Sequence, residues 1–93
     1  MTVFLISYDL TKKKPEFDYE ILWTELERLG AHRFQDSVWL ANLSNTAKEV
    51  VEHLKGYVHS DDRLWASSVR RGEYWYTNAK AGTSDWLKEN PPA

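Results

Sequence analysis

The sequence predicts a small α+β protein in which one antiparallel sheet packs against two helices. Apolar residues alternate at strand spacing in four segments, and two further segments carry apolar stripes at helical spacing. The order along the chain is strand, helix, strand, strand, helix, strand. This is the order of the ferredoxin-like βαββαβ sandwich, with both helices on one face of the sheet. A chain of 93 residues is long enough for one such domain.

The first strand is predicted at residues 2–10, and both of its faces are mainly apolar. Both faces therefore need cover, by helices on one side and by a partner on the other. A loop over residues 11–16 leads to Asp18, which can cap a helix running to about Leu29. Gly30 is expected to end this helix in the left-handed conformation. The strand places Phe4, Ile6 and Tyr8 on one face, and Val3, Leu5, Ser7 and Asp9 on the other.

The second and third strands are close enough in sequence for a tight turn at Asp36 and Ser37. The second helix opens at Thr46, and Glu49 follows three residues later, as in a capping box. This helix is expected to end near Gly56. The three remaining strands are predicted at residues 31–35, 38–43 and 64–70.

A C-terminal extension, residues 72–93, follows the predicted ferredoxin-like domain of residues 1–71. Its first residues, 72–76, contain three aromatics and are a candidate fifth strand. Ser84 is expected to cap a short helix over residues 85–90. Aromatic side chains anchor protein interfaces, so the extension is expected to pack on the domain or on a dimer partner. Trp75 and Trp86 are the candidates for that contact.

Composition excludes several classes of function. Lys and Arg number 12 and Asp and Glu number 14, so the net charge of −2 weighs against broad electrostatic binding of nucleic acid. Short basic clusters at residues 12–14 and 70–71 remain candidates for local phosphate contacts. The chain has no cysteine, which excludes disulfides, thiolate catalysis and cysteine zinc sites. No apolar run has the length of a membrane span, and the N-terminus reads as a strand, so a cytoplasmic protein is expected.

The three histidines, His32, His53 and His59, lack the spacing of a local metal site. Glu49 and His53 are four residues apart on the second predicted helix, where such a pair forms an exposed helix contact.

Three segments resemble a known family. The first strand ends in Ser7-Tyr8-Asp9, and residues 29–39 place Arg-x-Gln-x-Ser-Val and an aromatic shortly after a glycine. The turn at residues 60–63, Ser-Asp-Asp-Arg, precedes the fourth strand. In these motifs the chain resembles the second CRISPR-associated protein and the superfamily that includes the virulence-associated D-type endoribonucleases. It is most similar to short stand-alone, SinR-like members from bacteria and phages.

The resemblance implies a homodimeric, metal-dependent endonuclease acting on RNA or DNA. In the family, the aspartate matching Asp9 lies near the dimer axis, where two copies are proposed to hold one divalent metal. Asp9 is therefore the candidate catalytic residue and the candidate ligand of Mg²⁺, an ion that activates water and stabilises charge at phosphorus. Ser7, Arg33 and Ser37 are the candidates for binding phosphate.

Each of these residues also has a structural interpretation. Asp9 can cap the loop that follows it or pair with a lysine, and Ser7 can fit a tight sheet interface. Arg33 can pair with an acidic residue across an interface. The alternative function is therefore a non-catalytic dimeric module that binds protein or nucleic acid. The acidic net charge, the aromatic extension and the single candidate catalytic carboxylate favour it.

Overall fold

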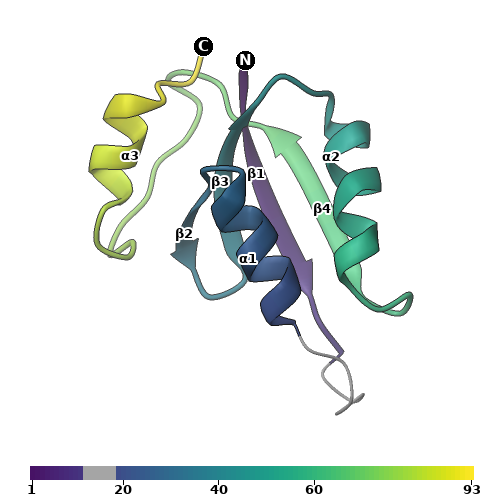
Figure 1. Ribbon diagram of the computed structural model, residues 1–93. Helices are drawn as coiled ribbons and strands as arrows, with labels where there is room; N and C mark the ends of the chain where they lie inside the picture. Colours follow the sequence, from purple (N-terminus) through teal and green to yellow (C-terminus); the bar gives the residue numbers. More distant parts are fainter. Residues whose placement is uncertain (12–18) are drawn as a thin grey trace.

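The computed structural model describes residues 1–11 and 19–93, and all six elements predicted before the extension are present (Figure 1). The predicted loop residues 12–16 and the predicted cap Asp18 lie outside the described residues. The strands are β1 (Thr2–Asp9), β2 (His32–Gln35), β3 (Val38–Leu43) and β4 (Arg63–Ser68). The helices are α1 (Glu20–Arg28), α2 (Ala47–Leu54), the 3₁₀ helix η1 (Lys55–Tyr57) and α3 (Thr83–Glu89).

The four strands form one antiparallel sheet in the order β2-β3-β1-β4. The central strand β1 pairs with β3 over residues 2–7 and with β4 over residues 4–9, so that Ile6 lies opposite Trp39 of β3 and Ala66 of β4. Because side chains alternate across a strand, this register fixes which residues share a face of the sheet. The protein is therefore α+β, as predicted.

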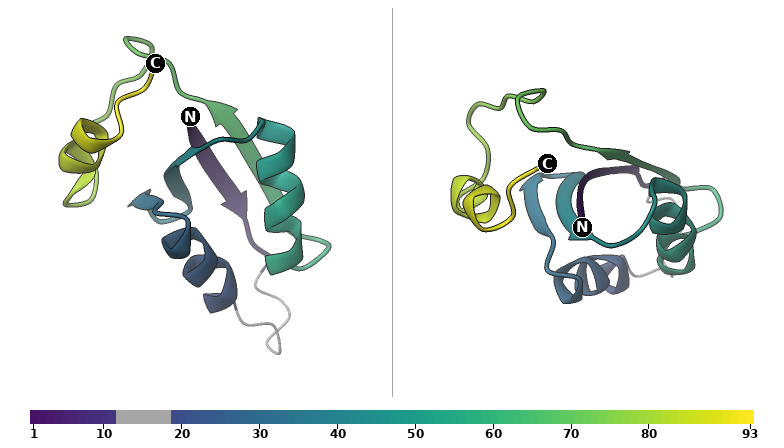
Figure 2. Two further views of the ribbon diagram at one scale, coloured as in Figure 1. Left: turned by 45° about the horizontal axis from the view of Figure 1, so that its top comes forward. Right: turned by 90° about the horizontal axis from the view of Figure 1, so that it is seen from above.

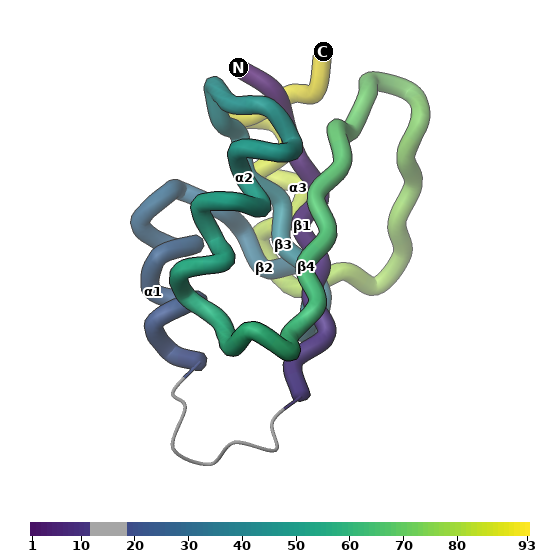
Figure 3. Tube along the Cα trace, turned by 90° about the vertical axis from the view of Figure 1, so that its right-hand side faces the viewer, coloured from purple at the N-terminus to yellow at the C-terminus, as the bar shows by residue number. Residues whose placement is uncertain are grey.

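Helices α1 and α2 cover one face of the sheet, as the views from above and from the side show (Figures 2 and 3). Leu22, Leu26 and Leu54 reach this core from the helices and are almost completely buried. Phe4 and Ile6 meet them from β1, which confirms the predicted division of β1 into two faces. The apolar periodicity of the sequence thus specifies this layer.

The ends of the two helices follow the predicted local rules. Gly30 has φ +77, and the amides of Gly30 and Ala31 donate to carbonyls of the last turn of α1. At α2 the Thr46 hydroxyl accepts the Glu49 amide at 3.1 Å, and the Glu49 carboxylate accepts the Thr46 amide at 2.9 Å. The predicted capping box is therefore confirmed.

The other face of the sheet is partly covered by α3. Leu87 of α3 packs with Val3, Phe34 and Leu40 in a second, smaller core. The side view shows residues 70–82 on this side of the strands, opposite α1 and α2 (Figure 3). We call this side of the sheet, opposite α1 and α2, the open face.

Two predictions for the extension were wrong. Residues 72–76 do not form a fifth strand, because Gly72 adopts φ +78 in a turn in which the Glu73 amide donates to the Arg70 carbonyl. Ser84 does not cap α3, because the helix begins at Thr83, two residues before the predicted start, after Gly82 at φ +92. The Ser84 hydroxyl instead lies 2.8 Å from the Tyr76 hydroxyl.

Candidate functional site

Asp9 lies at the end of β1 on the open face and is paired with Arg63. The two residues are opposite each other in the β1–β4 register, and their side chains form an ion pair of 2.7 Å. The Asp9 side chain is 68% exposed, so water screens this pair. From the sequence, a lysine was the expected alternative partner of Asp9. In the structure the partner is an arginine of β4.

The side chains around Asp9 fit a Mg²⁺ ion poorly. The Asp9 carboxylate, which would bind the ion, instead accepts a hydrogen bond from the Arg63 guanidinium. Within residues 1–11 and 19–93, no three or more His, Cys, Asp or Glu side chains gather as a metal site. Mg²⁺ commonly uses only one or two carboxylates together with water, so the poor fit comes from the guanidinium that already faces this carboxylate. We therefore derive no metal-dependent step from this position.

The other predicted phosphate ligands are not brought together with Asp9. Ser7 is half-buried on the open face, opposite Val38 and Trp65. Arg33 lies opposite Trp39 in the β2–β3 register and points to the helix-covered face, whereas a bulge after it places Gln35 opposite Val38 beside the open face. Ser37 is exposed in the turn after β2.

Arg33 is held over two indole rings. Its guanidinium carbon lies 5.0 Å from the centre of the Trp23 ring and 5.7 Å from that of the Trp39 ring. The same guanidinium donates hydrogen bonds to the Asp36 carbonyl, from Nε at 2.9 Å and from Nη2. These contacts engage the planar group on its face and its edge, so Arg33 fixes the turn between β2 and β3.

A buried hydrogen-bond cluster lies directly beneath Arg33. The Tyr8 hydroxyl accepts the indole N–H groups of Trp23 and Trp39, both at 3.0 Å. It lies 3.4 Å from the Asp36 carbonyl, to which it donates. Buried Trp and Tyr polar groups need such partners, and the cluster explains why β1 carries a tyrosine at this core position.

Sequence reasoning missed a charged cluster between α1 and α2. Glu25 is only 6% exposed, and its carboxylate accepts two hydrogen bonds from Arg28 at 2.7 Å and contacts His53 Nε2 at 2.6 Å. His53 was expected to pair with Glu49, but Glu49 is used in the capping box. The hydrogen bonds from Arg28 and then His53 lower the pKa of Glu25 to about 2, although burial opposes this shift.

His32 and Thr83 form a close pair beside the smaller core. His32 Nε2 lies 2.7 Å from the Thr83 hydroxyl, which itself donates to the Lys80 carbonyl at 2.7 Å. Because the hydroxyl has one proton, Nε2 must be the donor toward Thr83. The ring is therefore not placed to activate Thr83 as a nucleophile, and it also stacks against Trp86. This pair holds α3 against β2.

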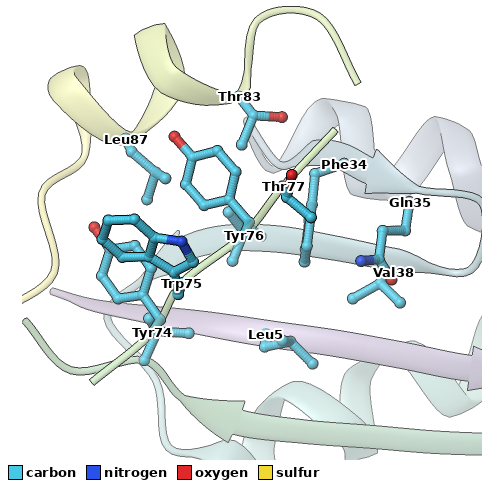
Figure 4. A pocket seen from close by; sticks show the side chains of 12 residues that line it. Leu5, Phe34, Gln35, Val38, Tyr74, Trp75, Tyr76, Thr77, Thr83 and Leu87 are labelled. Carbon is cyan, nitrogen blue, oxygen red and sulfur yellow. The ribbon is translucent and has the colours of Figure 1, made fainter. Parts of the chain in front are cut away.

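The open face carries a cavity of about 500 Å³ (Figure 4). The sheet contributes Leu5, Val38 and Leu40, while Leu87 comes from α3. Residues 72–77 are called the aromatic loop, and its residues 74–77 form part of the remaining lining. None of the described residues that line the cavity is charged, and its surface is mainly apolar. Its volume is typical of a binding pocket.

The aromatic loop exposes a large apolar side chain beside this cavity. Trp75 is 95% exposed, while Tyr74 and Tyr76 are partly shielded by their surroundings. In the close view the three rings gather at one end of the cavity, with Leu87 and Thr83 of α3 nearby (Figure 4). The aromatic density of the sequence indicated this segment, but only the chain path from β4 to α3 shows that it borders a cavity.

The segment that carries the loop is fixed by several bonds to the rest of the protein. The Lys80 amide donates to the Phe34 carbonyl of β2 at 3.2 Å, and the Arg71 amide donates to the Ala93 carbonyl at 3.0 Å. Trp86 is only partly exposed and donates its indole N–H to the Gly30 carbonyl at 2.9 Å. Of the two candidate contact tryptophans, Trp86 therefore packs within this chain, and Trp75 is left exposed.

Comparison with known proteins finds no matching family model and no significant match among solved structures. Among the described residues, every helix is too short or too polar to cross a membrane.

Proposed function

We propose that this protein is a non-catalytic protein-interaction module that binds an apolar or aromatic side chain of its partner in the cavity on the open face. The observation that carries this proposal is the apolar cavity of about 500 Å³ bordered by a tryptophan that is 95% exposed. Tryptophan and tyrosine are the residues that dominate binding energy at protein interfaces. A large exposed aromatic beside an uncharged recess is typical of a recognition surface.

The placement of the polar residues supports binding over catalysis. Asp9 and Arg63 neutralise each other at the far end of β1, and Arg33 is engaged by two indole rings. The His32 ring donates to Thr83 and so does not act as its base. No acid and base pair of the described residues therefore faces the cavity.

We also propose that the fold is of the ferredoxin-like type and that the protein is related to the CRISPR-associated superfamily. The element order and the antiparallel pairing of β1 with both β3 and β4 support a split β-α-β arrangement. The likeness of residues 1–70 to that superfamily remains a prediction from the motifs alone.

The binding proposal can be tested with a displayed library of random peptides selected on the purified protein. We expect enriched peptides to share an aromatic or large aliphatic anchor and to bind with micromolar affinity. Val38→Trp, which fills the cavity, should weaken their binding at least tenfold, whereas Trp65→Ala should not. Trp65 is the matched control because it is an exposed tryptophan of the open face that does not line this cavity. Peptides that bind all variants equally would contradict the proposal.

The nuclease expected from the resemblance is the competing function, since Asp9 is exposed on a face that a second copy can approach. Labelled RNA and DNA incubated with Mg²⁺ distinguish the two. We expect equal, background cleavage by the wild type and by Asp9→Ala, which removes an exposed pair and leaves the fold intact. Cleavage that the wild type performs and that Asp9→Ala loses would replace the binding proposal with a metal-dependent nuclease.

A further inference from the structure

Resting on the proposed function, we infer that the partner bound at this cavity is a second copy of the chain, with Trp75 of each copy inserted into the cavity of the other. The contact is a reciprocal exchange across a two-fold axis, in which one surface supplies both the inserted side chain and the recess that receives it. The two copies therefore bury each other's most exposed aromatic residue.

The first argument is that the two complementary features lie on one surface. Trp75 is 95% exposed and borders an unfilled cavity of about 500 Å³ in the same chain. A two-fold arrangement buries two indoles and fills two cavities with one contact, whereas a one-way arrangement leaves an indole and a cavity uncovered and extends into a filament.

The second argument is chemical match. The described residues lining the cavity carry no formal charge, and an indole ring is uncharged. Tyr76 and Phe34 offer ring contacts, and the side-chain oxygens of Gln35 and Thr77 are acceptors for the indole N–H. A charged side chain entering this recess would lose its hydration without finding an opposite charge. With a net charge of −2, two copies also repel each other only weakly.

The third argument is the preparation of the receiving surface. The Tyr76 hydroxyl is held at 2.8 Å from Ser84 of α3, and the Lys80 amide ties the end of the segment to β2. The cavity side of the loop is thus held before any partner arrives. Pre-organisation of this kind reduces the entropy lost when the partner binds.

The expected area predicts the strength of the dimer. An aromatic side chain buries ~150–250 Å². Two Trp75 side chains, the surfaces that receive them, the partly exposed tyrosines and the cavity rims therefore bury roughly 1,000 Å² in total. Stable specific interfaces bury about 1,200–2,000 Å², so this contact is at the weak end of specific association. We expect a dimer with a dissociation constant in the micromolar range, between roughly 10 and 500 µM.

Sedimentation velocity on the full chain, from about 1 µM to about 1 mM, measures this equilibrium. We expect the wild type to dimerise as its concentration rises, and Trp75→Ala to dimerise at least tenfold more weakly. The matched control Trp65→Ala removes an indole of the open face that is 63% exposed and should dimerise as the wild type does. If both variants lose dimerisation equally, the association is a non-specific one of exposed tryptophans, and the exchange of Trp75 is overturned.

Cavity-filling variants test the receiving surface separately. Val38→Trp in the sheet and Thr77→Phe in the loop fill the cavity from opposite sides, and circular dichroism verifies that each is folded. Each alone should fail to dimerise. A mixture of Trp75→Ala with a filled variant should form heterodimers more weakly than the wild type, because one indole and one cavity remain. Dimers that persist in both filled variants would overturn the inference.

The outcomes separate this inference from the proposed function. A wild type that stays monomeric at about 1 mM while selected peptides bind at the cavity overturns the self-association and leaves the binding module. A monomer that also yields no cavity-dependent peptide overturns both.

Discussion

At the scale of single residues, the most informative side chain is one that the helical pattern did not distinguish. Glu25 lies on the buried side of α1, where a lone carboxylate would be strongly unfavourable. Arg28, one turn later, and His53 of α2 compensate for the burial of this charge, because they donate hydrogen bonds to both carboxylate oxygens. The buried charge therefore joins two helices that otherwise contact through apolar side chains.

Because the pKa of Glu25 is low in the folded protein, the free energy of unfolding decreases at acidic pH. Its pKa falls from 4.5 to about 2 on folding, so the contribution is complete above pH 4.5 and is lost as the pH falls toward 2. Such a shift corresponds to on the order of 3 kcal/mol of unfolding free energy. Urea unfolding of the wild type at pH 6 and pH 3 should show about 2 kcal/mol of this loss, because the rest occurs below pH 3. Glu25→Gln should remove this part of the pH dependence.

The control is Glu27→Gln, an exposed glutamate of the same helix. It should keep the wild-type pH dependence. A Glu25→Gln protein that loses as much stability between pH 6 and pH 3 as the wild type would contradict the role given to this cluster.

At the scale of elements, α3 differs from the other helices in how it is held. It has no side-chain cap at its N-terminus and only 7 residues, so its own hydrogen bonds stabilise it little. Its position comes from Leu87 in the smaller core, from Trp86 on the Gly30 carbonyl and from the His32–Thr83 bond. α3 is therefore a helix whose formation depends on docking.

Docking of α3 should weaken in mild acid. Burial lowers the pKa of His32 below its usual 6.5, because the folded protein disfavours the charged ring. The associated stability is complete above pH 6.5 and is lost progressively as the pH falls through the folded-state pKa. Amide hydrogen exchange in residues 83–89 should become faster relative to α2 between pH 7 and pH 5, after correction for the intrinsic pH dependence of exchange.

In His32→Gln the exchange of α3 relative to α2 should no longer change over this pH range. His59, which lies in the turn before β4, provides the comparison, since His59→Gln should leave the behaviour of α3 unaltered. An unchanged α3 response in His32→Gln would assign the effect to another group.

At the scale of the whole molecule, what the sequence could predict depended on the range of the interactions. The capping box at Thr46 and the end of α1 at Gly30 are set within a few residues, and both were predicted. The Glu25–His53 contact joins residues 28 apart, and the cavity combines β1, β3, the aromatic loop and α3. No local pattern encodes such meetings, so they could not be predicted.

The residues of the candidate site were likewise predictable only where short-range interactions determine their position. Asp9 was correctly placed at a strand end, but its partner Arg63 follows from the pairing of β1 with β4. Arg33 was predicted as a phosphate ligand, but its place opposite Trp39 turns it toward the helix-covered face, where it lies over two indole rings. Exposure of Trp75 depends on the irregular path of the extension, for which sequence periodicity offers no rule.

The same long-range packing predicts that the extension and the sheet unfold together. Leu87 is 8% exposed and completes the smaller core on Val3, Phe34 and Leu40. Leu87→Ala should lower the unfolding free energy by about 2–3 kcal/mol, near the low end of the range for buried leucines, since part of the site borders an open cavity. Urea unfolding followed by far-ultraviolet circular dichroism, which reports on all helices and strands, should show this loss.

Tryptophan fluorescence in the same experiment identifies the cooperative unit. A single unit gives coincident transitions by both probes in the wild type and in Leu87→Ala. Ser84→Ala is the matched control, because this exposed residue of α3 lies outside the smaller core and should shift the midpoint little. If the midpoint by circular dichroism stays at its wild-type value in Leu87→Ala, the extension is an appendage that the sheet does not need. One side of the cavity would then be able to separate from the sheet, because α3 forms part of the cavity lining.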